Sequence, residues 1–223
     1  MSCTHTHTHT HTKAHVHTPP SFKEKRIKYL RSVFDEEAGQ TGFLQSKSWQ
    51  SMFSTRDPAV AEAKCDELGF EWEWENGEAR NGGLIINHVM NATRFHPVTG
   101  DEVWHNHLMV YHKSTIPSEY AFSAQHLDSW DMIMRHFLAR IMVWLNDLDP
   151  DEARRYSLYG QGAMHEGDEP MAMSDVDHVR LLVWKNTIAY PHQAGDIAML
   201  DNRRMAHGRQ PFTGPRSVMV TWA

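Results

Sequence analysis

The feature that most constrains the fold is the C-terminal stretch of residues 197–222, where a segment rich in proline and glycine separates two apolar runs. The runs Ile197–Leu200 and Ser217–Trp222 predict strands, and residues 211–215 predict the turn between them. His207 lies before this turn, and Arg216 lies after it, nine residues beyond His207. Both side chains could therefore face one cavity, in which a planar guanidinium is suited to binding a dicarboxylate.

Composition limits the class of protein and of partner. The chain has 223 residues, 40% of them hydrophobic, so we expect one folded domain. A net charge of −6 without a long basic run argues against nucleic acid or an anionic membrane as a partner and favours a small-molecule substrate. The longest apolar run, residues 141–145, is too short to span a bilayer. Two cysteines, Cys3 and Cys65, give neither a disulfide framework nor a zinc cluster, which fits a cytoplasmic location.

The first 20 residues form a low-complexity leader, in which His-Thr occurs four times in succession over residues 5–12. This segment cannot bury enough apolar surface to fold, so we expect residues 1–20 to be disordered and residues 21–223 to form the domain. Because imidazoles bind zinc, copper and nickel, one interpretation is a metal-binding tail. Another is a translated CA dinucleotide repeat, since CAC encodes His and ACA encodes Thr.

Local signals predict a helix and a hairpin in the first half of the chain. Residues 57–69 contain an Asp N-cap, a first-turn proline, apolar residues at helical spacing and a final glycine. In residues 70–74 aromatic side chains alternate with glutamate, and Asn76-Gly77 is a strong hairpin signal, so we expect strands on both sides of it. Leu84–Ile86 predicts a further strand.

The middle of the chain predicts another strand and two longer helices. Val103–Tyr111 predicts a strand that follows a turn at residues 96–100. Apolar residues recur every three or four positions from Leu127 to Leu148, as on one face of an amphipathic helix. A second helix is predicted from Ser174, with Asp177 at the capping-box position. The pattern indicates a mostly antiparallel β protein with inserted helices, built on a jelly-roll core.

Segments spread over residues 27–223 resemble the taurine dioxygenase-like (TauD/TfdA) family of Fe(II)/2-oxoglutarate oxygenases, particularly its clavaminate synthase-like branch. The last of these segments is the most specific. The matching segments are Ser48-Trp49-Gln50 with Phe53 and Thr55, Ala61 to Cys65, Glu73-Trp74, His96 to Gly100, Trp104 with Asn106, Gly195-Asp196, and Asp201 to Arg216.

The resemblance implies a double-stranded β-helix that holds iron through two histidines and one carboxylate, a geometry typical of non-haem Fe(II) oxygenases. It also implies that His207 is the distal histidine ligand and that Arg216 binds the far carboxylate of 2-oxoglutarate. The expected activity is the oxidation of a small molecule.

One part of the family pattern is missing. The family places a His-x-Asp or His-x-Glu pair before the Ser-Trp-Gln segment, and only the leader occupies that place here. We therefore expect a jelly roll that is incomplete on its N-terminal side, a partial dioxygenase domain, and weak iron binding with little turnover.

Three other groups are candidate sites. His126-Leu127-Asp128 has the spacing of the pair but lies at the predicted start of a helix, where residues two apart point in different directions. His105 and His107 would share one face of a predicted strand and could chelate a metal together with His207. His165, Glu166 and Asp168 lie in a predicted glycine-flanked loop, where they are substrate-loop residues or solvated polar groups.

Two further hypotheses compete with the oxygenase. The chain could be a non-catalytic jelly-roll binding protein that keeps the arginine pocket. It could also be a metal chaperone that acts through its histidine-rich leader. The sequence predicts neither the substrate nor the oligomeric state.

Overall fold

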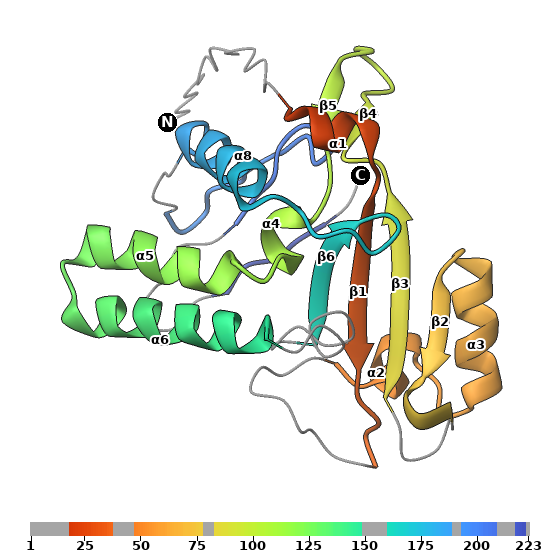
Figure 1. Ribbon diagram of the computed structural model, residues 1–223. Coiled ribbons are helices and arrows are strands. Elements are labelled where there is room, and N and C mark those ends of the chain that lie inside the picture. The colour runs from red at the N-terminus through yellow and green to blue at the C-terminus, as the bar shows by residue number, and fades with distance from the viewer. Residues whose placement is uncertain are drawn as a thin grey trace.

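The computed structural model describes residues 18–37, 47–77, 83–148, 160–188, 193–208 and 217–221 (Figure 1). Within them lie a four-stranded antiparallel sheet with the strand order β2-β3-β1-β6, a separate two-stranded hairpin, and seven helices. The strands are β1 (Ile27–Val33), β2 (Glu71–Trp74), β3 (Leu84–Met90), β4 (Thr93–Phe95), β5 (Glu102–Trp104) and β6 (Gln161–His165). The helices are α1 (Pro20–Glu24), α2 (Trp49–Phe53), α3 (Pro58–Glu67), α4 (Leu108–Tyr111), α5 (Thr115–Leu127), α6 (Trp130–Asn146) and α8 (Met173–Lys185).

Strand β1 is central in the sheet although its sequence gave no clear strand signal. It pairs with β3 along its whole length, from Ile27 opposite Met90 to Val33 opposite Leu84. Its first five residues also pair with β6, which lies where the sequence predicted a loop. The partner strands of β1 are therefore far away in the chain, and no local turn signal predicts the pairing.

The helix predicted at residues 57–69 and the strands expected on both sides of Asn76-Gly77 are confirmed. The Asp57 carboxylate accepts a hydrogen bond from the Ala59 N–H at 3.0 Å and caps α3, and Gly69 follows the helix with a φ of 69°. This positive φ suits glycine because it has no side chain to clash with the backbone. β2 and β3 pair antiparallel, but Asn76 and Gly77 belong to a short 3-10 helix, Glu75–Gly77, and not to a two-residue hairpin turn.

One face of the sheet buries two clusters of apolar side chains, because alternate residues of each strand point to the same side. Near the start of β1, Ile27 and Tyr29 pack with Phe22, Ala92, Leu108, Met171, Val176 and Val179. Near the end of β1, Val33 packs with Leu84, Ile86, Trp49, Phe53, Ala61 and Cys65. Helices α1, α4 and α8 thus cover one end of this face, and α2 and α3 cover the other.

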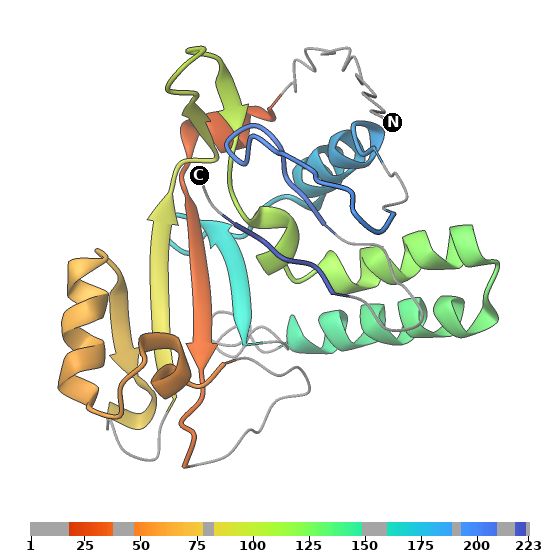
Figure 2. The same ribbon diagram turned by 180° about the vertical axis from the view of Figure 1, so that it is seen from behind.

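The amphipathic helix predicted over residues 127–148 is confirmed as α6, which begins at Trp130. α5 ends at Leu127, and Asp128, with a φ of 46°, adopts a left-handed conformation between the two helices. Figures 1 and 2 show α5 and α6 side by side, extending away from the sheet. Within α6 only Ala139 is buried, whereas large apolar side chains are exposed at Trp130, Ile133, Met134, Phe137, Leu138, Ile141, Met142, Trp144 and Leu145.

Other expected elements also need correction. The strand predicted at Val103–Tyr111 continues only to Trp104, and the chain then forms α4. Ile197–Leu200 and the described part of the last predicted strand, residues 217–221, form no strand. The helix predicted from Ser174 is α8, but Ala172 occupies its N-cap without a side-chain hydrogen bond.

The strands are antiparallel, as predicted, but the mostly β composition is wrong for the described residues because helices contain more of them than strands. Residues 1–17 of the leader lie outside the described residues, and α1 begins at Pro20. None of the described helices combines the length and the hydropathy needed to cross a membrane.

A buried polar chain joins α8 to the segment before α5. The Arg180 guanidinium donates to Ser114 Oγ at 2.8 Å, and Ser114 Oγ lies 2.7 Å from His112 Nδ1. The Ser114 N–H also points to His112 Nδ1 at 3.3 Å, so this nitrogen is the acceptor and the ring is neutral. Burial, and then the charges of Lys113 and Arg180, lower the pKa of His112 from 6.5 to about 4.

We predict that this histidine makes the protein less stable in mild acid. Between pH 6.5 and 4 the unfolded state binds a proton at His112 that the folded state does not bind, so stability is full above this range and falls as the pH decreases through it. From about pH 7 to about pH 5 the loss should be about 2 kcal/mol. Urea unfolding at both pH values measures it. His112→Leu should reduce the difference, and an equal loss in this variant would contradict the prediction.

We also predict that truncating a buried side chain of the sheet costs more stability than truncating an exposed side chain of α6. Leu84 is fully buried beside α2 and α3, so Leu84→Ala should lower the free energy of unfolding by about 2–5 kcal/mol. Leu138 is 54% exposed on α6, so Leu138→Ala should change it by only about 0.5 kcal/mol. Denaturant unfolding compares the two, and similar losses would show that the assigned core is wrong.

Candidate functional site

His207 lies in the segment of residues 193–208, which has no regular secondary structure. A turn at residues 202–204 precedes it, and its side chain is exposed. Arg216 lies outside the described residues, as does the whole of the predicted turn at residues 211–215. The structure therefore places His207, while the expectation that it shares a cavity with Arg216 stays a prediction.

His105 and His107 do not share a strand face, so that expectation is wrong. Both follow the end of β5, and His107 is the N-cap residue of α4. The His107 N–H donates to the Tyr29 hydroxyl at 3.1 Å. The His105 N–H donates to the Ala92 carbonyl at 3.2 Å, and burial is the main cause that lowers the pKa of the His105 side chain. Each residue thus takes part in a different structural contact.

The His126–Asp128 segment lies where one helix ends and the next begins. His126 is in the last turn of α5, and Asp128 is the C-cap of this helix. Asp128 also directly precedes Ser129, the N-cap residue of α6. The side chain of His126 is outside the part of the chain that the structure describes.

His165, Glu166 and Asp168 do not form a common site. His165 is buried at the end of β6, where burial is the main cause that lowers its pKa. Glu166 accepts from Arg26 Nε at 2.8 Å, and Asp168 pairs with Lys28 at 2.8 Å. The Arg26 hydrogen bond lowers the pKa of the Glu166 carboxyl. These ion pairs join the turn after β6 to β1, so the two carboxylates have structural partners.

A histidine that we expected only to belong to a turn makes a long-range contact instead. His96 is buried between β4 and β5, and its Nε2 lies 3.0 Å from Asp201 Oδ2. The two residues are 105 positions apart. Figure 2 shows the segment that follows α8 (blue) beside the β4–β5 hairpin. Both residues belong to segments of the family resemblance, but no local spacing predicts that they meet.

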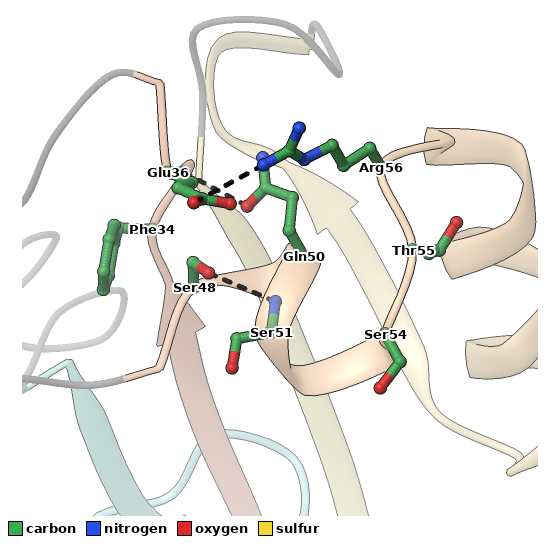
Figure 3. Close-up of a pocket in the computed structure, with 8 residues that line it drawn as sticks. All are labelled: Phe34, Glu36, Ser48, Gln50, Ser51, Ser54, Thr55 and Arg56. Carbon is green, nitrogen blue, oxygen red and sulfur yellow. Dashed lines mark hydrogen bonds and ion pairs between the residues drawn. The ribbon is translucent and has the colours of Figure 1, made fainter.

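The close-up in Figure 3 shows a polar hollow of about 500 Å³ beside α2. Ser48 Oγ accepts from the Ser51 N–H at 3.2 Å, and Arg56 lies 3.8 Å from the Glu36 carboxylate. None of the predicted site residues lines this hollow. Its lining residues are Phe34, Glu36, Ser48, Gln50, Ser51, Ser54, Thr55 and Arg56.

The described residues fit a metal ion only in part. The exposed imidazole of His207 is a suitable nitrogen donor for Fe(II). A facial triad requires two more ligands, however, and the described residues contain no group of three His, Cys, Asp or Glu side chains arranged to hold a metal. The part of the chain that the structure describes therefore does not form a complete iron site.

Comparisons with known proteins extend over nearly the whole chain. Residues 25–222 match the family described as "Taurine catabolism dioxygenase TauD, TfdA family". The dapdiamide synthesis protein DdaC of Enterobacter agglomerans is 30% identical over 199 residues, which are 89% of this chain and 49% of that protein. A clavaminate synthase-like protein of Arabidopsis thaliana is 22% identical over 200 residues, which are 89% of this chain and 48% of that protein.

The chain thus spans about half the length of the curated relatives that it matches. The family implies a jelly-roll fold, with which the antiparallel sheets are consistent. Because the family match covers most of the sequence, this chain belongs to the TauD/TfdA family of dioxygenases.

Proposed function

We propose that the protein is an Fe(II)/2-oxoglutarate-dependent oxygenase that acts on a small molecule. The observation that carries the proposal is the family match over residues 25–222, which includes both His207 and Arg216. The named relatives point in the same direction, since one takes part in dapdiamide synthesis and the other is clavaminate synthase-like.

The proposed roles follow from the chemistry of the two side chains. His207 would supply one neutral nitrogen ligand to Fe(II). Arg216 would bind the distal carboxylate of 2-oxoglutarate, because its planar guanidinium can donate two parallel hydrogen bonds. Fe(II), when bound, would supply the activation of O2, which oxidises 2-oxoglutarate to succinate and CO2. Because the described residues provide only one of the three expected ligands, we assign no further step to the metal.

A binding protein without oxidation chemistry is the second candidate. It is favoured by one observation, namely that the described residues contain no three-ligand cluster. In this case Arg216 would hold a dicarboxylate by itself, so binding would not depend on metal. The two functions therefore differ in a property that calorimetry can measure.

We predict that the full chain binds 2-oxoglutarate only when Fe(II) is present. The measurement is anaerobic calorimetry with 2-oxoglutarate as the titrant, with and without an excess of Fe(II). Fe(II) must be in excess because the histidine-rich leader also offers metal ligands and would compete for the ion. The leader contains no arginine, so it cannot bind a dicarboxylate through arginine contacts when metal is absent. Binding of equal affinity with and without Fe(II) would favour the second candidate.

We also predict that His207→Ala and Arg216→Ala each weaken this metal-dependent binding by at least about tenfold, because each removes a charge-assisted or metal-mediated contact. Two matched controls remove the same side chains from α6: His136→Ala and Arg140→Ala should leave the affinity unchanged. If the α6 variants weaken binding as much as the other two, the proposed roles of His207 and Arg216 are wrong.

A further inference from the structure

The bonding of His96 fixes which of its ring nitrogens carries a proton. His96 is only 6% exposed, and the N–H groups of Val98 and Thr99 point to its Nδ1 at 3.3 and 3.2 Å. Nδ1 is therefore an acceptor, and the proton is on Nε2. Nε2 then donates to Asp201 Oδ2, 3.0 Å away. The β4–β5 turn thus holds the imidazole in the tautomer and orientation that bind Asp201.

Asp201 uses its two carboxylate oxygens for different partners. Oδ2 accepts from His96, while Oδ1 accepts from the Arg203 N–H at 3.1 Å. The Asp201 carbonyl accepts from the N–H groups of Arg204 and Met205, both at 3.0 Å. The hydrogen bond from Arg203 and then the one from His96 lower the pKa of Asp201, so the carboxylate is charged. One side chain therefore both shapes the turn and ties it to His96.

A further contact joins the same turn to the same hairpin, since Arg204 lies 3.4 Å from the Asp101 carboxylate. Of the two contacts, the His96–Asp201 bond, which we call the clasp, is the one with a buried partner, because Arg204 and Asp101 are each about one-third exposed or more. Burial reduces screening by water, so the clasp should contribute most.

The clasp limits where His207 can lie. His207 follows Arg204 by three residues, and three residues of extended chain reach about 10 Å. A fixed turn at residues 201–204 therefore restricts the His207 imidazole to a small region beside the hairpin. Without the clasp, the restriction on that region would have to come from weaker, exposed contacts.

We propose that His96 is a positioning residue for His207: through Asp201 it holds the turn from which His207 projects. This inference rests on the proposed function, in which His207 is an iron ligand. A ligand held in place before the metal arrives loses less conformational entropy when it binds, which raises the affinity of the site.

Hydrogen exchange of the metal-free full chain tests the clasp directly. Asp201→Asn keeps an oxygen for the Arg203 N–H but turns an amide N–H2 toward the protonated Nε2 of His96. His96→Leu removes the ring nitrogens and keeps an apolar side chain of similar size. Amides of residues 202–207 should exchange about tenfold faster in both variants. Asp201 is 45% exposed, so its variant measures the clasp even if His96→Leu does not fold.

His112→Leu is the matched control, because His112 is equally buried but bonds to Ser114, away from the turn. Its exchange at residues 202–207 should equal that of the wild type. If His112→Leu speeds exchange there as much as His96→Leu does, the effect is a general loss of stability and the proposal is wrong. It is equally wrong if Asp201→Asn leaves the exchange unchanged.

The second measurement is 2-oxoglutarate affinity in the presence of excess Fe(II). Asp201→Asn and His96→Leu should weaken it about tenfold, as His207→Ala does, while His112→Leu should not. If only His207→Ala weakens binding, the positioning role is overturned and the proposed function stands. If His207→Ala has no effect, the proposed function fails and the positioning role fails with it.

Discussion

The structure depends on the pairing of β1 with two strands at once. Ile27–Val33 lies between β3 and β6, and its side chains contribute to both apolar clusters. The start of this strand is also tied to the turn after β6, through the ion pairs of Arg26 with Glu166 and of Lys28 with Asp168. Ordering this one strand therefore places α1, α4 and α8 at one end of the sheet and α2 and α3 at the other.

The candidate site is built in a different way, because the segment that carries His207 belongs to no sheet. It is held by side chains, since His96 and Asp101 on the hairpin contact Asp201 and Arg204. Two of the buried histidines, His96 and His112, accept backbone hydrogen bonds at Nδ1.

Elements whose signals lie in neighbouring residues could be predicted from the sequence, whereas elements that depend on distant residues could not. α3 was predictable because Asp57, Pro58 and Gly69 act on neighbouring residues. β2 was predictable because its alternating aromatic residues and the Asn-Gly signal after them are also local. β1 and β6 were missed because their burial depends on partners more than 50 residues away, a pairing that no local pattern records. The apolar period of α6 predicted the helix correctly but not the exposure of its apolar side, since the period indicates which residues share a side and not what faces that side. His207 could be nominated from its sequence context, whereas its link to His96 through Asp201 required the fold.

The α5–α6 pair has a consequence for motion. In proteins most helical stability comes from the tertiary packing of an amphipathic face. α6 buries a single residue, Ala139, and packs along α5 rather than on the sheet. α5 is held from its other side, because Phe122 stacks on Trp184 of α8. The free energy of opening α6 should therefore lie well below that of the sheet, so we expect transient unfolding to begin in α6 while β1 keeps its partners.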